Sequence, residues 1–166
     1  MSKVLGILKY ALSREKEGNI FYKNNKDKVK NSQLKEIFEN LAEMEYDHMK
    51  YIKELIETTE KGNKKLNEVI FDEDNSFFET RKKNEIVEKD IEDMTSDLSI
   101  LRMAYLIEDD FKNFYENAAK NIEDKDAIDI LKKLADWEKT HRDTLYALYR
   151  DMMKDYWDEM GFEPLY

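Results

Sequence analysis

The sequence predicts an all-α protein, an antiparallel four-helix bundle made of two helical hairpins that are joined by a long crossover. Three observations predict it. The chain of 166 residues has one proline and four glycines but is 40% charged and 41% hydrophobic, a composition with few helix breakers. Four segments carry apolar residues at alternating steps of three and four, the spacing of a core-facing helical stripe. The first hairpin also recurs in the second half at a constant offset.

The first hairpin consists of two expected helices. One runs from about Lys3 to about Val29 with Ser2 as its N-cap, and the next runs from about Gln33 to about Glu60 with Ser32 as its N-cap. Gly62 is a natural C-terminal stop. The inward positions of the two helices are, in order, Val4, Leu8, Ala11, Glu15, Gly18, Tyr22 and Val29, then Leu34, Phe38, Leu41, Glu45, His48, Ile52 and Leu55.

Residues 63 to about 96 lack a regular stripe. Because so long a loop is unusual in a compact domain, we expect a crossover that travels the length of the bundle, with a short helix within 76–93. The chain is expected to form a single domain over residues 1–166.

The second hairpin again consists of two expected helices. One runs from about Asp97 to about Asn121 with Thr95 or Ser96 as cap. The other runs from about Ala127 to about Met160 with Asp124 or Asp126 as cap, and a short apolar tail follows over 162–166. The inward positions are Leu101, Ala104, Glu108, Phe111, Tyr115, Ala118 and Ile122, then Ala127, Leu131, Leu134, Glu138, His141, Leu145, Leu148 and Met152.

Charge and composition exclude several classes of function. A formal net charge of -10 disfavours nucleic acids and anionic membranes as partners. The absence of cysteine excludes disulfides, thiolate zinc sites and iron–sulfur clusters within the chain. No apolar run reaches the length that spans a membrane, and the N-terminus lacks a signal-peptide cleavage site, so we expect a cytoplasmic protein.

An internal repeat with an offset of 93 residues links the two hairpins. It aligns 11 identical residues over the 46 positions from 11 to 56 without a gap. Seven of these pairs fall on the inward stripes, and they include every ionisable residue there. The pairs are Ala11/Ala104, Glu15/Glu108, Phe21/Phe114, Tyr22/Tyr115, Asn24/Asn117, Ile37/Ile130, Leu41/Leu134, Ala42/Ala135, Glu45/Glu138, His48/His141 and Leu55/Leu148.

The chain has only two histidines, and each follows a glutamate at the third position before it. Residues at i and i+3 share a helix face, so each pattern offers a carboxylate and an imidazole to one point. Buried carboxylates that meet in a core require cations. One glutamate from each of two helices and Glu-x-x-His from the other two form the ligand set of ferritin-like di-iron and di-manganese proteins. The candidate ligands are Glu15, Glu45, His48, Glu108, Glu138 and His141. They suit iron or manganese, and zinc also fits.

Tyr22 and Tyr115 lie seven residues after Glu15 and Glu108 on the same helix faces. Helical side chains lean toward the N-terminus, so each ring is expected to lean back toward the glutamate of its own helix. Two interpretations remain open: a hydroxyl that hydrogen-bonds a metal-ligating carboxylate, and ordinary aromatic packing.

The paired blocks ALSREKEGNIFYKNN and LAEMEYDH in the first half, and AYLIEDDFKNFYENA and LADWEKTH in the second, resemble the rubrerythrin branch of the ferritin-like superfamily. The resemblance implies that the six residues named above bind two iron ions, with Glu45 and Glu138 as bridges. It implies reduction of hydrogen peroxide, or of O₂, in oxidative-stress defence, by a homodimer.

The chain departs from the rubrerythrin pattern in two places. Rubrerythrins carry an additional carboxylate on the third helix, one turn from the first, where this chain has Tyr105 and Phe111. The resemblance therefore does not extend to the redox-dependent exchange of ligands known in that family. Full-length rubrerythrins also carry a rubredoxin domain with four cysteines. The electron donor is accordingly expected to be a separate protein such as rubredoxin.

Two alternative functions remain open at the level of sequence. The first is ferroxidase activity or iron storage in a ferritin-like protein, because the ligand set is shared with those proteins. The second is a helical module that a metal stabilises without catalysis.

Overall fold

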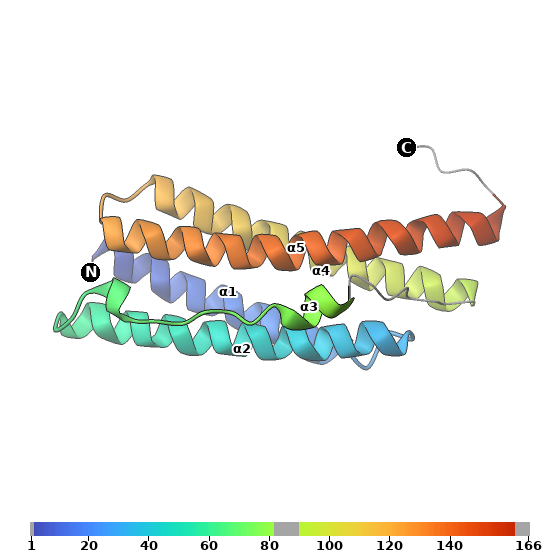
Figure 1. Ribbon diagram of the computed structural model, residues 1–166, viewed down its shortest axis with the longest axis horizontal. Helices are drawn as coiled ribbons and strands as arrows, with labels where there is room; N and C mark the ends of the chain where they lie inside the picture. Colours follow the sequence, from blue (N-terminus) through green and yellow to red (C-terminus); the bar gives the residue numbers. More distant parts are fainter. Residues whose placement is uncertain (1, 82–89, 162–166) are drawn as a thin grey trace.

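The computed structural model describes residues 2–81 and 90–161 and is an antiparallel four-helix bundle (Figure 1). This confirms the predicted all-α fold. The long helices are α1, α2, α4 and α5, and the crossover between the hairpins contains the short elements η1 and α3. The bounds are α1 Lys3–Asn25, α2 Ser32–Lys61, η1 Leu66–Glu68, α3 Ser76–Arg81, α4 Ile91–Lys120 and α5 Lys125–Met160.

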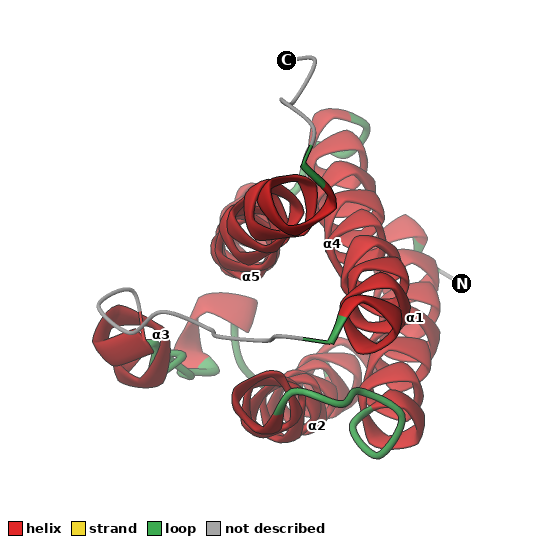
Figure 2. Ribbon diagram, turned by 90° about the vertical axis from the view of Figure 1, so that its right-hand side faces the viewer, coloured by secondary structure: helices red, strands yellow, loops and turns green. Residues whose placement is uncertain are grey.

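The bundle is assembled from two hairpins, α1 with α2 and α4 with α5. Seen end-on in Figure 2, the helices follow one another around the bundle in the order α1, α2, α5, α4. The crossover runs along the side between α2 and α5 in both views (Figures 1 and 2). The two helices that carry Glu-x-x-His are therefore the two that flank the crossover.

The start of α4 differs from the prediction. The helix begins at Ile91, and the side chain of Asp90 accepts a hydrogen bond from the backbone N–H of Asp93, so the predicted caps Thr95 and Ser96 were wrong. Thr95 instead donates its hydroxyl to the carbonyl of Ile91 inside the helix. The apolar stripe continues back from Leu101 through buried Leu98 and Met94, which is why the helix starts earlier.

The turn between α1 and α2 also differs from the prediction. The helix α1 ends at Asn25 rather than near Val29, and Asn31 rather than Ser32 caps α2, accepting from the N–H groups of Gln33 and Leu34. The cause is Asp97 of α4, which is fully buried and accepts the backbone N–H groups of Lys30 and Asn31 at 2.8 and 2.9 Å. One carboxylate thereby ties the first hairpin's turn to the second hairpin.

The remaining helix ends follow the prediction closely. Gly62 and Gly161 end α2 and α5 in the left-handed conformation, and Asp124 caps α5 by accepting from the N–H of Ala127. The short helix α3 confirms the helix expected within 76–93. The predicted tail over 162–166 lies outside the described residues. None of the helices in the described ranges combines the length and apolar character needed to cross a membrane.

The core consists of two apolar clusters with a polar layer between them. One cluster surrounds Leu8, Leu55 and Leu134, and the other surrounds Phe38 and Leu101. On all four long helices the inward glutamates lie between the residues of the first cluster and those of the second. Both ends of the polar layer are therefore closed by packed apolar side chains.

Candidate metal centre

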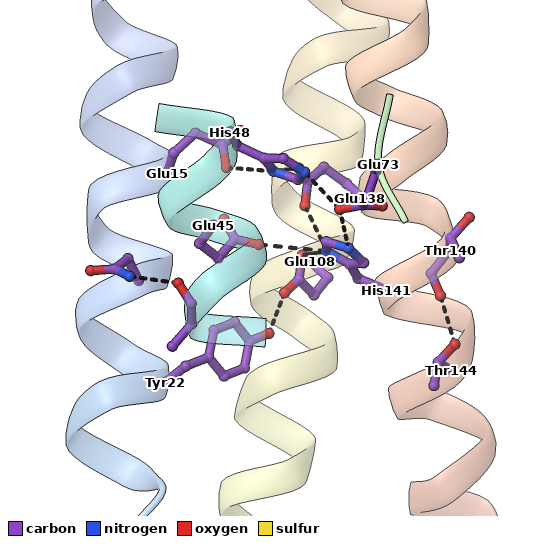
Figure 3. A network of polar contacts seen from close by, with 12 residues as sticks. Glu15, Tyr22, Glu45, His48, Glu73, Glu108, Glu138, Thr140, His141 and Thr144 are labelled. Atoms are coloured by element: carbon purple, nitrogen blue, oxygen red, sulfur yellow. Dashed lines mark hydrogen bonds and ion pairs between the residues drawn. The ribbon is translucent and has the colours of Figure 1, made fainter. Parts of the chain in front are cut away.

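The four long helices bring all six predicted ligands into one polar layer at mid-bundle. Each of these side chains is 0% exposed. In Figure 3 they point toward one another from four different helices, with the lone glutamates on α1 and α4 and the Glu-x-x-His pairs on α2 and α5. The residues are Glu15, Glu45, His48, Glu108, Glu138 and His141.

The six side chains form two overlapping groups, each able to hold one ion. In the first, Nδ1 of His48 lies 3.1 Å from Oε2 of Glu15 and 3.1 Å from Oε1 of Glu138. In the second, Nδ1 of His141 lies 3.5 Å from Oε1 of Glu45. It also lies 3.6 Å from Oε2 of Glu108 and 3.6 Å from Oε2 of Glu138. Glu45 and Glu138 belong to both groups.

These spacings fit ligands that share a cation. Metal–nitrogen and metal–oxygen bonds of roughly 2.1 Å at right angles place neighbouring ligand atoms about 3 Å apart. Several of the converging atoms also lack a hydrogen-bond partner although they are buried, which is costly in a protein core. They are both oxygens of Glu45 and Glu138, Oε2 of Glu108 and Nδ1 of His141. The chemistry and the spacing of this donor set therefore fit a pair of divalent metal ions.

Electrostatics indicates a site that holds protons when metal is absent. Burial, and then the neighbouring charge of Glu138, raises the pKa of Glu108 to about 8. The same two causes raise the pKa of Glu45 well above its usual value. Burial opposes ionisation of Glu138 as well, but the imidazole of His48, together with His141, lowers the pKa of Glu138. The layer thus contains more carboxylate charge than its two imidazoles can neutralise.

The two tyrosines contact the layer across the bundle. The hydroxyl of Tyr22 on α1 donates to Oε1 of Glu108 on α4, and that of Tyr115 on α4 donates to Oε1 of Glu15 on α1. The expected pairing, each ring with the glutamate of its own helix, was therefore wrong. Helix spacing places the ring on the inward face but does not identify the partner on the opposite helix. Burial, and then the adjacent glutamate, raises the pKa of both hydroxyls well above 10, so they remain hydrogen-bond donors.

Glu73 of the crossover is a site residue that the sequence did not predict. Its Oε1 lies 2.8 Å from Nε2 of His48 and 2.8 Å from Nε2 of His141, and its side chain is 2% exposed. Glu73 has no counterpart in the 93-residue repeat and lies outside any helical stripe. The available signal was its place between Phe71 and Phe78, two apolar anchors in a polar segment.

Aromatic side chains hold the imidazoles in place. The rings of His48 and His141 stack at 5.5 Å with an interplanar angle of 5°, and Trp137 stacks on His48 at 5.1 Å and 19°. Phe71 of the crossover packs edge-on against Trp137 at 5.3 Å. Phe78, only 1% exposed, lies 5.9 Å from the ring of His141. The crossover therefore covers the histidine side of the layer with aromatic rings.

Gly18 makes room for the shared ligand Glu45. A Cβ atom at Gly18 would lie 3.1 Å from Oε2 of Glu45 and 3.0 Å from Cε2 of Phe111. Phe111 lies three residues after Glu108, at a position where the sequence has no carboxylate. Its ring is 1% exposed and fills the space above Gly18.

An acidic cavity lies beside the centre, between α2 and the crossover. It has a volume of about 160 Å³. Glu73, whose Oε1 lies 2.8 Å from Nε2 of both histidines, forms part of its wall. Its lining residues are Asn40, Glu43, Met44, Asp47, Phe71, Glu73 and Asp74.

Comparisons with known proteins agree with this geometry. The family model described as Rubrerythrin matches residues 6–149. A solved structure of a hypothetical protein from Pyrococcus furiosus matches with a TM-score of 0.65 and 24% sequence identity, over 91% of this chain and 90% of that chain. At this identity the likeness shows the fold alone. A search of curated proteins gave no match.

Proposed function

The chain belongs to the rubrerythrin family, and from this premise we propose that it is a di-iron carboxylate redox protein that reduces hydrogen peroxide. O₂ is the second candidate oxidant. Oxidative-stress defence is the corresponding role in the cell. The observation that carries the proposal is the pair of overlapping carboxylate–imidazole groups that share Glu45 and Glu138.

Iron is the metal proposed for these groups, with manganese and zinc as alternatives. Hard carboxylate oxygens and two imidazoles suit ferrous iron, and four glutamates match the charge of two divalent cations. A ferrous pair bound there would supply the two electrons that, with two protons, convert hydrogen peroxide to two water molecules.

The protein's own side chains position the ligands, keep bulk water out of the layer and hold protons on the tyrosine hydroxyls. Glu45 and Glu138 would contact both ions, whereas Glu15 and Glu108 would each contact one. Tyr22 and Tyr115 hold these last two carboxylates by hydrogen bonds from hydroxyls that stay protonated. The apolar clusters on both sides of the layer exclude bulk water, which strengthens the electrostatic interactions within it.

The electrons are proposed to come from a separate donor protein such as rubredoxin. No cysteine is present that could bind an electron-transferring iron centre of the rubredoxin kind. The homodimer also stays a prediction, which light scattering during size-exclusion chromatography can test.

Ferroxidase activity is the second candidate function, and one observation favours it. The cavity beside Glu73 is lined by the carboxylates of Glu43, Asp47 and Asp74. Carboxylates beside a metal layer attract ferrous ions from solution, which a ferroxidase needs because ferrous iron is its substrate. In a ferroxidase, ferrous iron would be the substrate and O₂ the oxidant.

Stopped-flow mixing distinguishes these functions. The protein, loaded with two ferrous ions per chain, is mixed with hydrogen peroxide or with O₂ at equal concentration. Faster oxidation by peroxide, followed by re-reduction and repeated turnover with a donor, supports the proposed function. Faster oxidation by O₂, with release of ferric iron, supports the ferroxidase.

Paired substitutions test the third alternative, a helical module without catalysis. Glu45→Ala with Glu138→Ala removes both shared ligands. Loss of metal and of thermal stability in this double variant, together with a wild type that neither peroxide nor O₂ oxidises, would support the module. Unchanged metal content and thermal stability would contradict the metal centre itself, and with it both redox functions.

A further inference from the structure

Glu73 lies on the opposite side of the two histidines from the carboxylate groups. We propose that it is a positioning residue, one that holds both imidazoles with Nδ1 toward the metals and so couples the two metal positions to the crossover. This inference rests on the proposed metal centre. Glu73 would extend the metal centre beyond the four long helices and would physically link the two ion positions.

The two contacts of Glu73 define the orientation of both rings. A carboxylate oxygen has two lone pairs and can accept two N–H groups. Oε1 of Glu73 lies 2.8 Å from Nε2 of each histidine. When both Nε2 atoms donate to this oxygen, each neutral ring keeps the lone pair of Nδ1, the atom that faces the carboxylate groups. This is the tautomer that a metal requires on that side.

Sharing a single acceptor links the two ion positions. His48 belongs to one carboxylate group and His141 to the other. Loss of the carboxylate of Glu73 therefore frees both rings at once, whereas loss of a lone ligand such as Glu15 affects one group. We expect substitution of Glu73 to lower the affinity for both ions together.

The crossover is anchored on either side of Glu73, which fixes the carboxylate in place. Phe71 packs against Tyr51 at 5.6 Å and against Trp137 at 5.3 Å. Asp72 forms a 2.6 Å ion pair with Lys133 of α5. After Glu73, Phe78 is buried against His141. The carboxylate is thus placed by packing on both helices that carry histidine.

A metal ion between Glu73 and the two Nε2 atoms is the alternative interpretation, since these three side chains also lie close enough to share one. It would require both Nε2 atoms to lose their protons. The Nδ1 atoms, which face four buried glutamates, would then carry the protons and bind no metal. The experiment below separates the two arrangements.

The test uses zinc, which is diamagnetic and binds without redox chemistry. Zinc is titrated by calorimetry into the metal-free full chain, and the histidine rings are followed by ¹⁵N NMR, which is unambiguous with only two histidines. The variants are Glu73→Ala, which removes the acceptor, and Glu73→Gln, which keeps one acceptor oxygen without the charge. Glu68→Gln is the matched control, an exposed glutamate on the same crossover.

We expect wild type to bind two zinc ions with both rings coordinated through Nδ1 and both Nε2 protons protected from solvent exchange. Glu73→Ala should lose about tenfold or more in affinity at both positions, and the protection should disappear. Glu73→Gln should recover part of the zinc affinity and part of the protection of the Nε2 protons. Glu68→Gln should match wild type. If Glu73→Ala does not fold, Glu73→Leu, which fills the buried volume without an acceptor, is measured with the same expectations.

Two results would overturn the inference while leaving the metal centre intact: unchanged affinities in the acceptor-free variant, or weaker binding of one ion alone. Zinc on Nε2 of both wild-type rings, with the protons on Nδ1, would overturn it in favour of the alternative arrangement. Failure of wild type to bind two zinc ions would instead contradict the proposed metal centre itself.

Discussion

The hydroxyl of Tyr22 on α1 donates a hydrogen bond to the carboxylate of Glu108 on α4, the facing helix of the other hairpin. The repeat generates the reciprocal bond from Tyr115 to Glu15. Each hairpin therefore supplies the donor for the other hairpin's lone glutamate. The two copies of the repeat are held together through the polar layer itself, and this arrangement leads to the first prediction.

Removing one of these hydroxyls should destabilise the bundle. Tyr22→Phe leaves the ring in place but deprives buried Glu108 of its donor. Leaving a buried acceptor without its donor costs about 1–3 kcal/mol, so we expect a loss of that size in the free energy of unfolding of the metal-free protein. Tyr115→Phe should behave alike, because it is the equivalent position. Urea unfolding measures both, with exposed Tyr10→Phe as control; equal stability of all three variants would refute the role of the hydroxyls.

Two glycines of α1 form a matched pair for a test of ligand crowding. Gly18→Ala would place a Cβ atom 3.1 Å from Oε2 of Glu45 and should weaken metal binding by displacing a shared ligand. A Cβ atom at Gly6 meets nothing within 4 Å, so Gly6→Ala should stabilise the helix by about 1 kcal/mol without affecting the metals. Calorimetric metal titration and thermal unfolding check the pair. Equal metal affinities in the two variants would contradict the close approach of Glu45 to Gly18.

The metal-free protein should lose stability as the pH rises from about 5 to about 8. Burial, and then Glu138, raises the pKa of Glu108 from 4.5 to about 8 in the folded state, and that of Glu45 is raised too. A raised pKa gives stability that is complete below the unfolded-state value and is lost as the pH passes the folded-state value. The pKa of His48 is also raised: burial lowers it, but the negative charges of nearby glutamates, chiefly Glu15, raise it by more. This shift changes stability in the same direction.

Glu73 does not oppose this trend within the same window. Burial alone would raise its pKa, but His141 and His48 lower it to about 2, so its contribution changes only as the pH falls below 4.5. Thermal unfolding at a series of pH values measures the trend. Zinc should flatten it, because bound cations replace the protons. A metal-free protein that becomes more stable between pH 5 and 8 would contradict the electrostatic description.

Asp97→Ala should destabilise the fold and leave the metal centre intact. The substitution deprives the backbone N–H groups of Lys30 and Asn31 of their buried acceptor, at a cost of about 3 kcal/mol in the free energy of unfolding. The carboxylate contacts the turn between α1 and α2 at one end of the bundle, and its neighbour Leu98 belongs to the apolar cluster around Phe38 and Leu101. We therefore expect lower stability with unchanged metal stoichiometry, measured by urea unfolding and elemental analysis. Loss of metal without loss of stability would contradict this prediction.

The sequence identified the side chains of the layer because a physical signal marks each of them. A glutamate such as Glu15 on an apolar stripe is costly to bury without a partner, and the repeat places Glu108 at the same point of the other hairpin. Helix spacing then fixes which face they share. All six side chains meet in the structure, whereas their role as metal ligands stays a prediction.

Contacts between distant segments could not be predicted in the same way. Glu73 lies in a segment without periodicity, and its relation to the histidines depends on how Phe71 and Phe78 anchor the crossover. Helix ends were missed for a similar reason. Asp90, Thr95 and Ser96 are all competent caps, and the choice among them depends on whether Met94 finds a place in the core.

The most direct test of the metal centre is an anomalous-difference map from iron-loaded crystals, recorded at the iron absorption edge. We predict two peaks in each chain, one beside Nδ1 of His48 and one beside Nδ1 of His141, with Glu45 and Glu138 in contact with both. A single peak, no peak, or a peak between Glu73 and the two Nε2 atoms would contradict the assignment.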